Sequence, residues 1–134
     1  MRVTRASIYA VYGMCYLAGQ PSGRLVPISE IRRKCGLPEK HLAKIFRQLV
    51  RAGLLRSVRG ARGGFTLGRP AGTISPLDVI QVIEGSARVL WCPSHPLHRG
   101  RSPCCPLTRM VVEGRRQMEA VLREKTLDRL VVPP

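Results

Sequence analysis

The sequence predicts a mainly α-helical fold with a small β element. Residues 38–51 have the apolar spacing of an amphipathic helix, and residues 107–125 have that of a longer one. Between them, the short apolar runs 54–58 and 65–67 flank a glycine-rich loop, which predicts a hairpin. No apolar run approaches the ~18 residues of a membrane span, and no signal-peptide cleavage site follows the N-terminus. We therefore expect a soluble, cytoplasmic protein.

Positive charge is concentrated in the first half of the chain. The whole chain has 23 Lys and Arg against 8 Asp and Glu, a formal charge of +15. Residues 1–70 contain 14 of the basic and 2 of the acidic residues, a net charge of +12, whereas residues 71–134 have a net charge of +3. Such a basic region favours nucleic acid as a partner. An aromatic content of 4% argues against a protein that stacks successive single-stranded bases.

The predicted helix over residues 38–51 has two opposed faces. Apolar residues at three- and four-residue steps predict a buried face, which comprises Leu42, Ile45, Phe46 and Leu49. Basic residues with similar spacing lie on the other face, at Lys40, Lys44, Arg47 and Arg51. Pro38 suits the first turn of this helix, and Gly53 suits its end.

A shorter helix is predicted just before it, over residues 30–35, with Ser29 as its cap. Gly36 forms the turn between the two helices. Helix, glycine turn and helix form a helix-turn-helix, whose second helix enters the major groove of DNA. The hairpin that follows carries Arg59 and Arg62 in its loop. The whole arrangement predicts a winged helix-turn-helix.

Residues 1–70 are therefore predicted to bind duplex DNA. The start of a recognition helix approaches base edges, and arginines farther along it reach phosphates. Arginines beside glycines in the wing suit a minor groove, and Ala43 could contact a thymine methyl group. The candidate DNA-binding residues are Arg2, Thr4, Lys40, His41, Lys44, Arg47, Arg59 and Arg62.

A first helix is predicted over residues 2–19. Four of its side chains are expected to pack inward: Ile8, Val11, Tyr12 and Cys15. Cys35, four residues after Ile31, is interpreted like Cys15 as a small core residue.

Residues 71–134 are predicted to form a second region. Ser75 caps a helix whose first position is Pro76, and Asp78 lies near the positive end of the helix dipole. Its buried side is expected to contain Leu77, Ile80 and Ile83, and Gly85 ends it.

The last long helix is predicted over residues 107–126. Its apolar seam comprises Leu107, Met110, Val111, Gly114, Met118, Val121 and Leu122. A lone helix cannot bury such a seam, so it packs on another helix. A second copy of the chain would make this a dimerisation helix; packing within one chain is the alternative. Thr126 is expected to cap a final turn with Leu127 and Leu130.

The segment 91–106, WCPSHPLHRGRSPCCP, has neither helical nor strand periodicity. It contains three of the five cysteines and two of the three histidines. An odd cysteine count in a cytoplasmic protein favours metal or thiol chemistry over a disulfide framework. The candidate metal ligands are Cys92, His95, His98, Cys104 and Cys105.

Several motifs resemble one family. The N-terminal MRVTR, the wing LLRSVRGARGGF, the helix SPLDVIQVIEG and the C-terminal TLDRLV are similar to the IscR/NsrR (Rrf-two) family of bacterial transcriptional regulators. The resemblance implies a dimeric winged-helix regulator with a crossed dimerisation helix. In many members three cysteines hold an iron–sulfur cluster whose state alters DNA binding, which implies a [2Fe–2S] or [4Fe–4S] cofactor here.

The chain departs from the family's cysteine pattern. Cys92 matches the first family cysteine and Cys105 best matches the last, with Cys104 beside it. No cysteine occupies the middle position, near which His98 stands. Some members take a further ligand from an acidic residue of the partner's first helix, but the matching residue here is Ile8, which cannot ligate.

These observations predict a sequence-specific DNA-binding regulator, a repressor or dual regulator, controlled by a cluster in the 92–105 segment. Zinc, direct thiol sensing through a Cys92–Cys105 disulfide, or no ligand at all are the alternatives for that segment. The alternative for the whole chain is an architectural basic protein that binds DNA without sequence preference. No nucleophile–base pair, phosphate-binding glycine loop or paired carboxylates indicate an enzyme.

Overall fold

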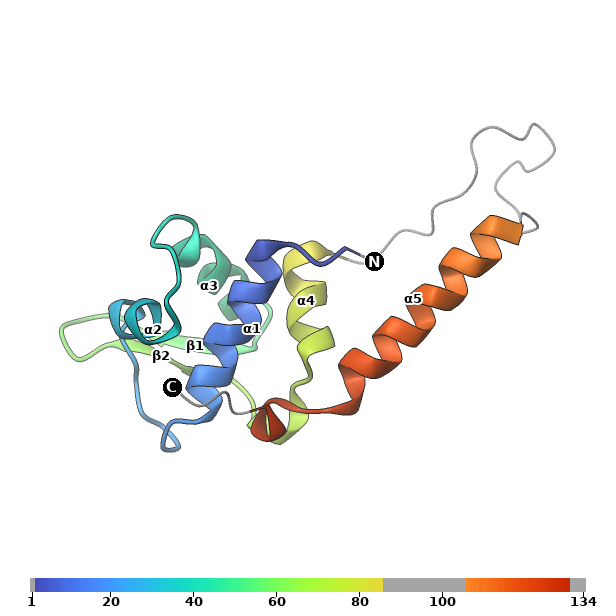
Figure 1. The fold of residues 1–134 in the computed structure, drawn as a ribbon. Helices are drawn as coiled ribbons and strands as arrows, with labels where there is room; N and C mark the ends of the chain where they lie inside the picture. Colours follow the sequence, from blue (N-terminus) through green and yellow to red (C-terminus); the bar gives the residue numbers. More distant parts are fainter. Residues whose placement is uncertain (1, 86–105, 131–134) are drawn as a thin grey trace.

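The computed structural model describes residues 2–85 and 106–130 (Figure 1). The elements follow in the order α1 (Arg5–Ala18), α2 (Ile28–Cys35), α3 (Leu42–Arg51), β1 (Leu55–Val58), β2 (Gly64–Leu67), the 3-10 helix η1 (Ala71–Thr73), α4 (Pro76–Glu84), α5 (Pro106–Glu124) and the 3-10 helix η2 (Leu127–Arg129). The fold is mainly helical with a small antiparallel sheet, as the sequence predicted. No helix in the described ranges is long and apolar enough to cross a membrane.

The sheet is the predicted hairpin. Strands β1 and β2 pair with Leu55 opposite Leu67 and Val58 opposite Gly64. Val26, in the loop before α2, extends the sheet through two backbone hydrogen bonds with Phe65, of 2.9 and 2.8 Å. The hairpin is therefore fixed to the loop that leads into α2.

Helix α1 packs through a different face from the one predicted. Its buried residues include Ala10, Gly13, Met14 and Leu17, at three- and four-residue steps. Ala10 and Gly13 let α1 lie close to its neighbours, Met14 and Leu17 are the large side chains of this buried face, and the larger residues of the predicted face are left outside. Ile8 and Tyr12 are 40% and 47% exposed, and Val11 is half-buried. Of the four residues predicted to pack inward, only Cys15 is fully buried.

Two predicted helix starts are also wrong. Helix α2 begins at Ile28 with Pro27 as its N-cap, so Ser29 lies inside the helix. Helix α3 begins at Leu42 rather than Pro38, because His41 has φ +74°, a left-handed backbone that an α-helix cannot contain.

Helix α4 begins as the sequence predicted. The Asp78 N–H donates to Ser75 Oγ at 3.2 Å, and the Ser75 N–H donates back to Asp78 Oδ2 at 2.9 Å, which forms a capping box around Pro76. Leu77 and Ile80 are buried and Ile83 is half-buried. Helix α4 packs along α1 and also contacts α3.

Helix α5 extends away from the other helices (Figure 1). Its C-terminal end is anchored through η2, where Leu127 is fully buried and its N–H donates to the Ile74 carbonyl at 2.9 Å. Thr126 is the N-cap of η2, but its hydroxyl donates to the Asp128 side chain rather than to the backbone. The predicted final turn is therefore present as a short 3-10 helix.

Candidate nucleic-acid interface

The apolar face of α3 fixes the helix in the core. All four predicted residues are at most 3% exposed: Leu42, Ile45, Phe46 and Leu49. The Phe46 ring meets the Phe65 ring of β2 edge to face, with centroids 5.0 Å apart and an 84° interplanar angle. A Cβ atom at Gly13 of α1 would lie only 2.8 Å from Phe46 Cζ, so this glycine lets α1 approach α3 closely.

The opposite face of α3 is exposed and basic. Lys44, Arg47 and Arg51 recur at three- and four-residue steps and are all exposed to solvent. Helix α3 contains no acidic residue that could neutralise them. The predicted division of this helix into an apolar and a basic face is confirmed, and the basic face suits a phosphate backbone.

Lys40 and His41 lie in the turn before α3, not in its first helical turn. Both are exposed. Glu39 of the same turn lies 3.9 Å from the Arg32 guanidinium of α2, in an ion pair whose members are both exposed. A solvent-exposed pair of this kind contributes little to stability. The turn therefore places two more donors beside the start of α3.

The wing carries its two predicted arginines at its tip. Arg59 and Arg62 lie in the loop between β1 and β2 and are exposed. Glycines shape this loop: a Cβ atom at Gly63 would lie 2.0 Å from the Val58 carbonyl oxygen, and one at Gly64 would lie 2.5 Å from that of Val26. The tight hairpin therefore requires these glycines, and the arginines are presented on a constrained loop.

Arg56 adds to the basic surface although it was not among the predicted residues. It is exposed on β1, opposite Thr66 of β2. The alternation of side chains along a strand could have identified it, since its neighbour Leu55 is buried. On α2, Arg32, Arg33 and Lys34 are likewise exposed.

The N-terminal segment places Arg2 and Thr4 at the start of α1. Arg2 is exposed, whereas Thr4 is the N-cap residue and is half-buried. Both the N–H and the hydroxyl of Thr4 donate to the carboxylate of Glu84, the last residue of α4, the N–H at 3.0 Å. Of the eight predicted DNA-binding residues, seven are exposed on the structure and Thr4 is held by another side chain.

A three-residue network secures α2 against α1. The Arg24 guanidinium donates to both carboxylate oxygens of Glu30, at 2.9 and 2.8 Å, and the Tyr16 hydroxyl donates to Glu30 Oε2 at 2.8 Å. The bonds from Arg24 and then from Tyr16 lower the pKa of Glu30 to about 2. The ionised carboxylate therefore joins α1, the following loop and the first helix of the helix-turn-helix.

Cys15 of α1 is a buried core residue, as the sequence predicted, whereas Cys35 of α2 is only half-buried against the core. Burial, and then the charge of Cys35, raises the pKa of Cys15 to about 11. Burial also raises the pKa of Cys35, whose thiol donates to the Tyr12 carbonyl at 3.9 Å. A raised pKa disfavours the thiolate at both positions, which is typical of unreactive cysteines.

The candidate metal ligands Cys92, His95, His98, Cys104 and Cys105 lie outside the described residues. Within residues 2–85 and 106–130, no group of three His, Cys, Asp or Glu side chains could hold a metal ion. Ile8, whose hydrocarbon side chain cannot ligate a metal, is exposed.

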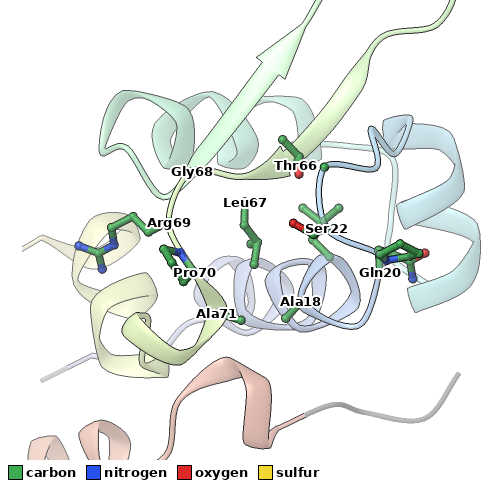
Figure 2. A pocket seen from close by; sticks show the side chains of 12 residues that line it. Ala18, Gln20, Ser22, Thr66, Leu67, Gly68, Arg69, Pro70 and Ala71 are labelled. Carbon is green, nitrogen blue, oxygen red and sulfur yellow. The ribbon is translucent and has the colours of Figure 1, made fainter.

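A hollow of about 390 Å³ lies between the C-terminal end of α1 and the segment that joins β2 to η1 (Figure 2). Figure 2 shows Leu67 and Ser22 beside this space and Arg69 at its edge. Arg69 is already engaged, since it donates to the Thr73 carbonyl at 3.3 Å and lies 3.7 Å from Asp78. None of the predicted DNA-binding residues lines the hollow.

Comparison with known proteins places this chain in a family. Residues 3–133 match the family described as Rrf2, iron-dependent transcriptional regulator. Among solved structures, CymR of B. subtilis, titled a global cysteine regulator, is 26% identical with a TM-score of 0.80, over 98% of this chain and 96% of that one. IscR of T. potens is 32% identical with a TM-score of 0.73, over 97% and 86%. The oxidised form of Staphylococcus aureus CymR is 27% identical with a TM-score of 0.76, over 100% and 98%.

Proposed function

This chain belongs to the Rrf2 family of transcriptional regulators, and we propose that it is a sequence-specific repressor that binds duplex DNA as a homodimer. The observation that carries the proposal is the exposed basic face of α3, opposite a face that the core buries completely. A helix so placed, preceded by a turn and followed by a basic wing, is the arrangement that reads a major groove.

Each part of the surface has a distinct role in this proposal. Lys40 and His41, in the turn before α3, and Lys44, in its first turn, read base edges, for which Lys suits guanine O6 and N7. Arg47 continues the same face and contacts phosphate, as does Arg2. Arg59 and Arg62 of the wing enter a minor groove, where a narrow groove attracts guanidinium groups.

The proposed homodimer rests on α5. Leu107, Met110 and Val121 are 66%, 70% and 67% exposed in the single chain. A run of exposed large apolar residues along one helix marks an interaction surface. A second copy of α5 would cover it, and the resulting twofold symmetry would present two copies of α3 to two half-sites.

The proposed control is a cofactor or a thiol reaction in residues 92–105. The candidate holding residues are Cys92, Cys104, Cys105 and His98, and thiolate with imidazole suits an iron–sulfur cluster or zinc. Cys105 directly precedes Pro106, where α5 begins, and a helix N-terminus favours the thiolate. A bound cluster would supply a centre whose charge changes with its redox state. A change of charge at this centre would affect DNA binding through α5, the proposed dimer helix, which begins directly after Cys105 in the sequence.

DNA binding is tested by fluorescence anisotropy with a duplex site selected from random sequence. We expect Lys44→Ala/Arg59→Ala to weaken binding and to reduce the slope of log K against log salt by about 0.9 for each phosphate that is no longer neutralised. If Lys44 contacts a base, its removal costs about 1–3 kcal/mol at that base pair. The matched control, Lys125→Ala/Arg129→Ala, removes two exposed charges near the C-terminal end and should leave the slope near that of the wild type.

The same assay separates a repressor from a non-specific DNA-binding protein. A sequence-specific regulator should prefer its site to a scrambled duplex by roughly 10³-fold or more. Equal affinity for both duplexes would contradict the proposal.

The control is tested on protein purified without oxygen. Visible absorption together with iron, sulfide and zinc content distinguishes a cluster from zinc. A colourless, metal-free protein whose DNA affinity is unchanged by oxidants would refute control by the 92–105 segment.

A further inference from the structure

The last residue of α4 is hydrogen-bonded to the first turn of the chain. Glu84 Oε1 accepts from the Thr4 N–H at 3.0 Å and also from the Thr4 hydroxyl. The two partners are 80 positions apart in the sequence, so this contact is tertiary and joins the end of α4 to the start of α1. None of the sequence patterns above assigns a role to Glu84.

Thr4 is held from a second direction by Ser7. The Thr4 N–H also donates to Ser7 Oγ at 3.0 Å, and the Ser7 hydroxyl donates to the Thr4 carbonyl at 2.9 Å. Ser7 is fully buried, so its side chain has a fixed position in the core. The backbone and hydroxyl of Thr4 therefore have a defined position. The hydroxyl donates its proton to Glu84 and so does not donate it to a phosphate.

Glu84 is ionised in this environment. Burial raises the pKa of Glu84, but the hydrogen bonds from the Thr4 hydroxyl and N–H outweigh burial and hold the pKa below its ordinary value. Arg2 lies two residues before Thr4, and its side chain is exposed. Only Val3 separates Arg2 from Thr4, so the position of Thr4 limits where the Arg2 guanidinium can lie.

We propose that Glu84 is a positioning residue for DNA binding, which fixes Thr4 and so directs Arg2 to a phosphate. The proposal rests on the DNA-binding function proposed above. It gives Thr4 an indirect role and assigns to α4 a part in forming the DNA surface. The direct contact belongs to Arg2, and the Glu84 carboxylate acts only through Thr4.

The chemistry of the contact supplies a matched pair of variants. Both bonds from Thr4 end on the same oxygen, Oε1, and the amide oxygen of glutamine can accept both. Glu84→Gln therefore removes the charge and keeps the acceptor, whereas Glu84→Ala removes both. Any general gain in DNA affinity from deleting a negative charge is common to the two variants.

The experiment measures operator affinity against salt for the full-length wild type, Arg2→Ala, Glu84→Ala, Glu84→Gln and the double variant Arg2→Ala/Glu84→Ala. We expect Arg2→Ala and Glu84→Ala each to reduce the salt slope by about 0.9 per protomer, the value for one phosphate contact. The double variant should show no further reduction, because both changes remove the same contact. Glu84→Gln should retain most of the wild-type slope.

A purely structural role gives a different result. Glu84→Ala would then lower the melting temperature but leave the salt slope unchanged, or its effect would add to that of Arg2→Ala; either outcome overturns the proposal. If Glu84→Ala does not fold, Thr4→Val and Thr4→Ser provide the test. Valine lacks the hydroxyl and should reduce the slope, serine keeps it and should not, and equal slopes overturn the proposal. A wild-type chain without salt-dependent operator binding would refute the proposed function itself, and this inference with it.

Discussion

Helices α3 and α5 have the same kind of amphipathic sequence but opposite surroundings. The four apolar residues that face inward from α3 are at most 3% exposed, because α1, α4 and β1 pack around that helix. The apolar residues of α5 repeat with equal regularity, yet Met110 and Val121 are 70% and 67% exposed. Apolar periodicity thus indicates that a face will be covered, but it does not say by which chain.

The two helices also differ in how they are held. Helix α3 packs against α1, α4 and β1, whereas α5 contacts α4 and leads into η2, where Leu127 is buried and bonded to Ile74 (Figure 1). Helices in proteins owe most of their stability to the packing of their apolar face. We therefore expect α3 to depend on the fold of its own chain and α5 to depend on a second copy.

The largest expected effect is the loss of Phe46 from α3. Phe46→Ala should reduce the free energy of unfolding by about 3–5 kcal/mol, because it removes a fully buried ring that contacts Phe65 and lies against Gly13. Denaturant titration monitored by circular dichroism measures the change.

Met110→Ala is the matched change on α5. At protein concentrations low enough to favour single chains, it should cost less than about 0.5 kcal/mol, because the side chain is already exposed. A cost as large as that of Phe46→Ala under those conditions would show that the two apolar faces are covered in the same way, within one chain.

The second effect concerns the apolar face of α5 directly. Val121→Glu should weaken association of two chains by about 1–3 kcal/mol, since a carboxylate would be placed in an apolar interface. That is roughly a 5- to 150-fold rise in the dimer dissociation constant, measured by sedimentation equilibrium.

Glu113→Ala, which removes a carboxylate from an exposed position on the same helix, serves as the comparison. The wild type should be dimeric at micromolar concentration and Val121→Glu should remain folded. A monomeric wild type, or identical dissociation constants for all three proteins, would contradict the proposed interface.

The sequence predicted most of the fold because strong local signals agreed with the tertiary structure. The cap at Ser75, the hairpin around Gly63 and the two faces of α3 are all found where periodicity and turn chemistry put them. Helix α1 was interpreted less well, because periodicity favoured its large residues Ile8 and Tyr12 as core. The structure buries another face instead, which includes Ala10, Gly13, Met14 and Leu17, and the close approach to Phe46 requires the glycine at position 13.

The candidate site was predictable in part. Charged residues on a helix face can be identified from spacing alone, and seven of the eight DNA candidates are indeed exposed. The bond between Thr4 and Glu84 could not be predicted, because it joins residues 80 positions apart and no local pattern encodes it. The start of α3 was misplaced for a similar reason: the left-handed backbone of His41 is a property of the folded turn.

The smallest expected effect tests that start of α3. His41 adopts φ +74°, a conformation that costs a residue with a side chain roughly 1–2 kcal/mol and costs glycine almost nothing. Glycine loses more entropy on folding, by about 0.4–1 kcal/mol, so His41→Gly should stabilise the chain by a net value of about 0.5–1 kcal/mol.

His41→Ala keeps the backbone strain and removes the same imidazole, so the difference in stability between the two variants isolates the contribution of the backbone. If α3 instead continued back to Pro38, alanine would be the more stable variant, because alanine is the better residue inside a helix. Both variants should lose the same DNA affinity if the imidazole contacts DNA, which keeps the stability measurement separate from the binding measurement.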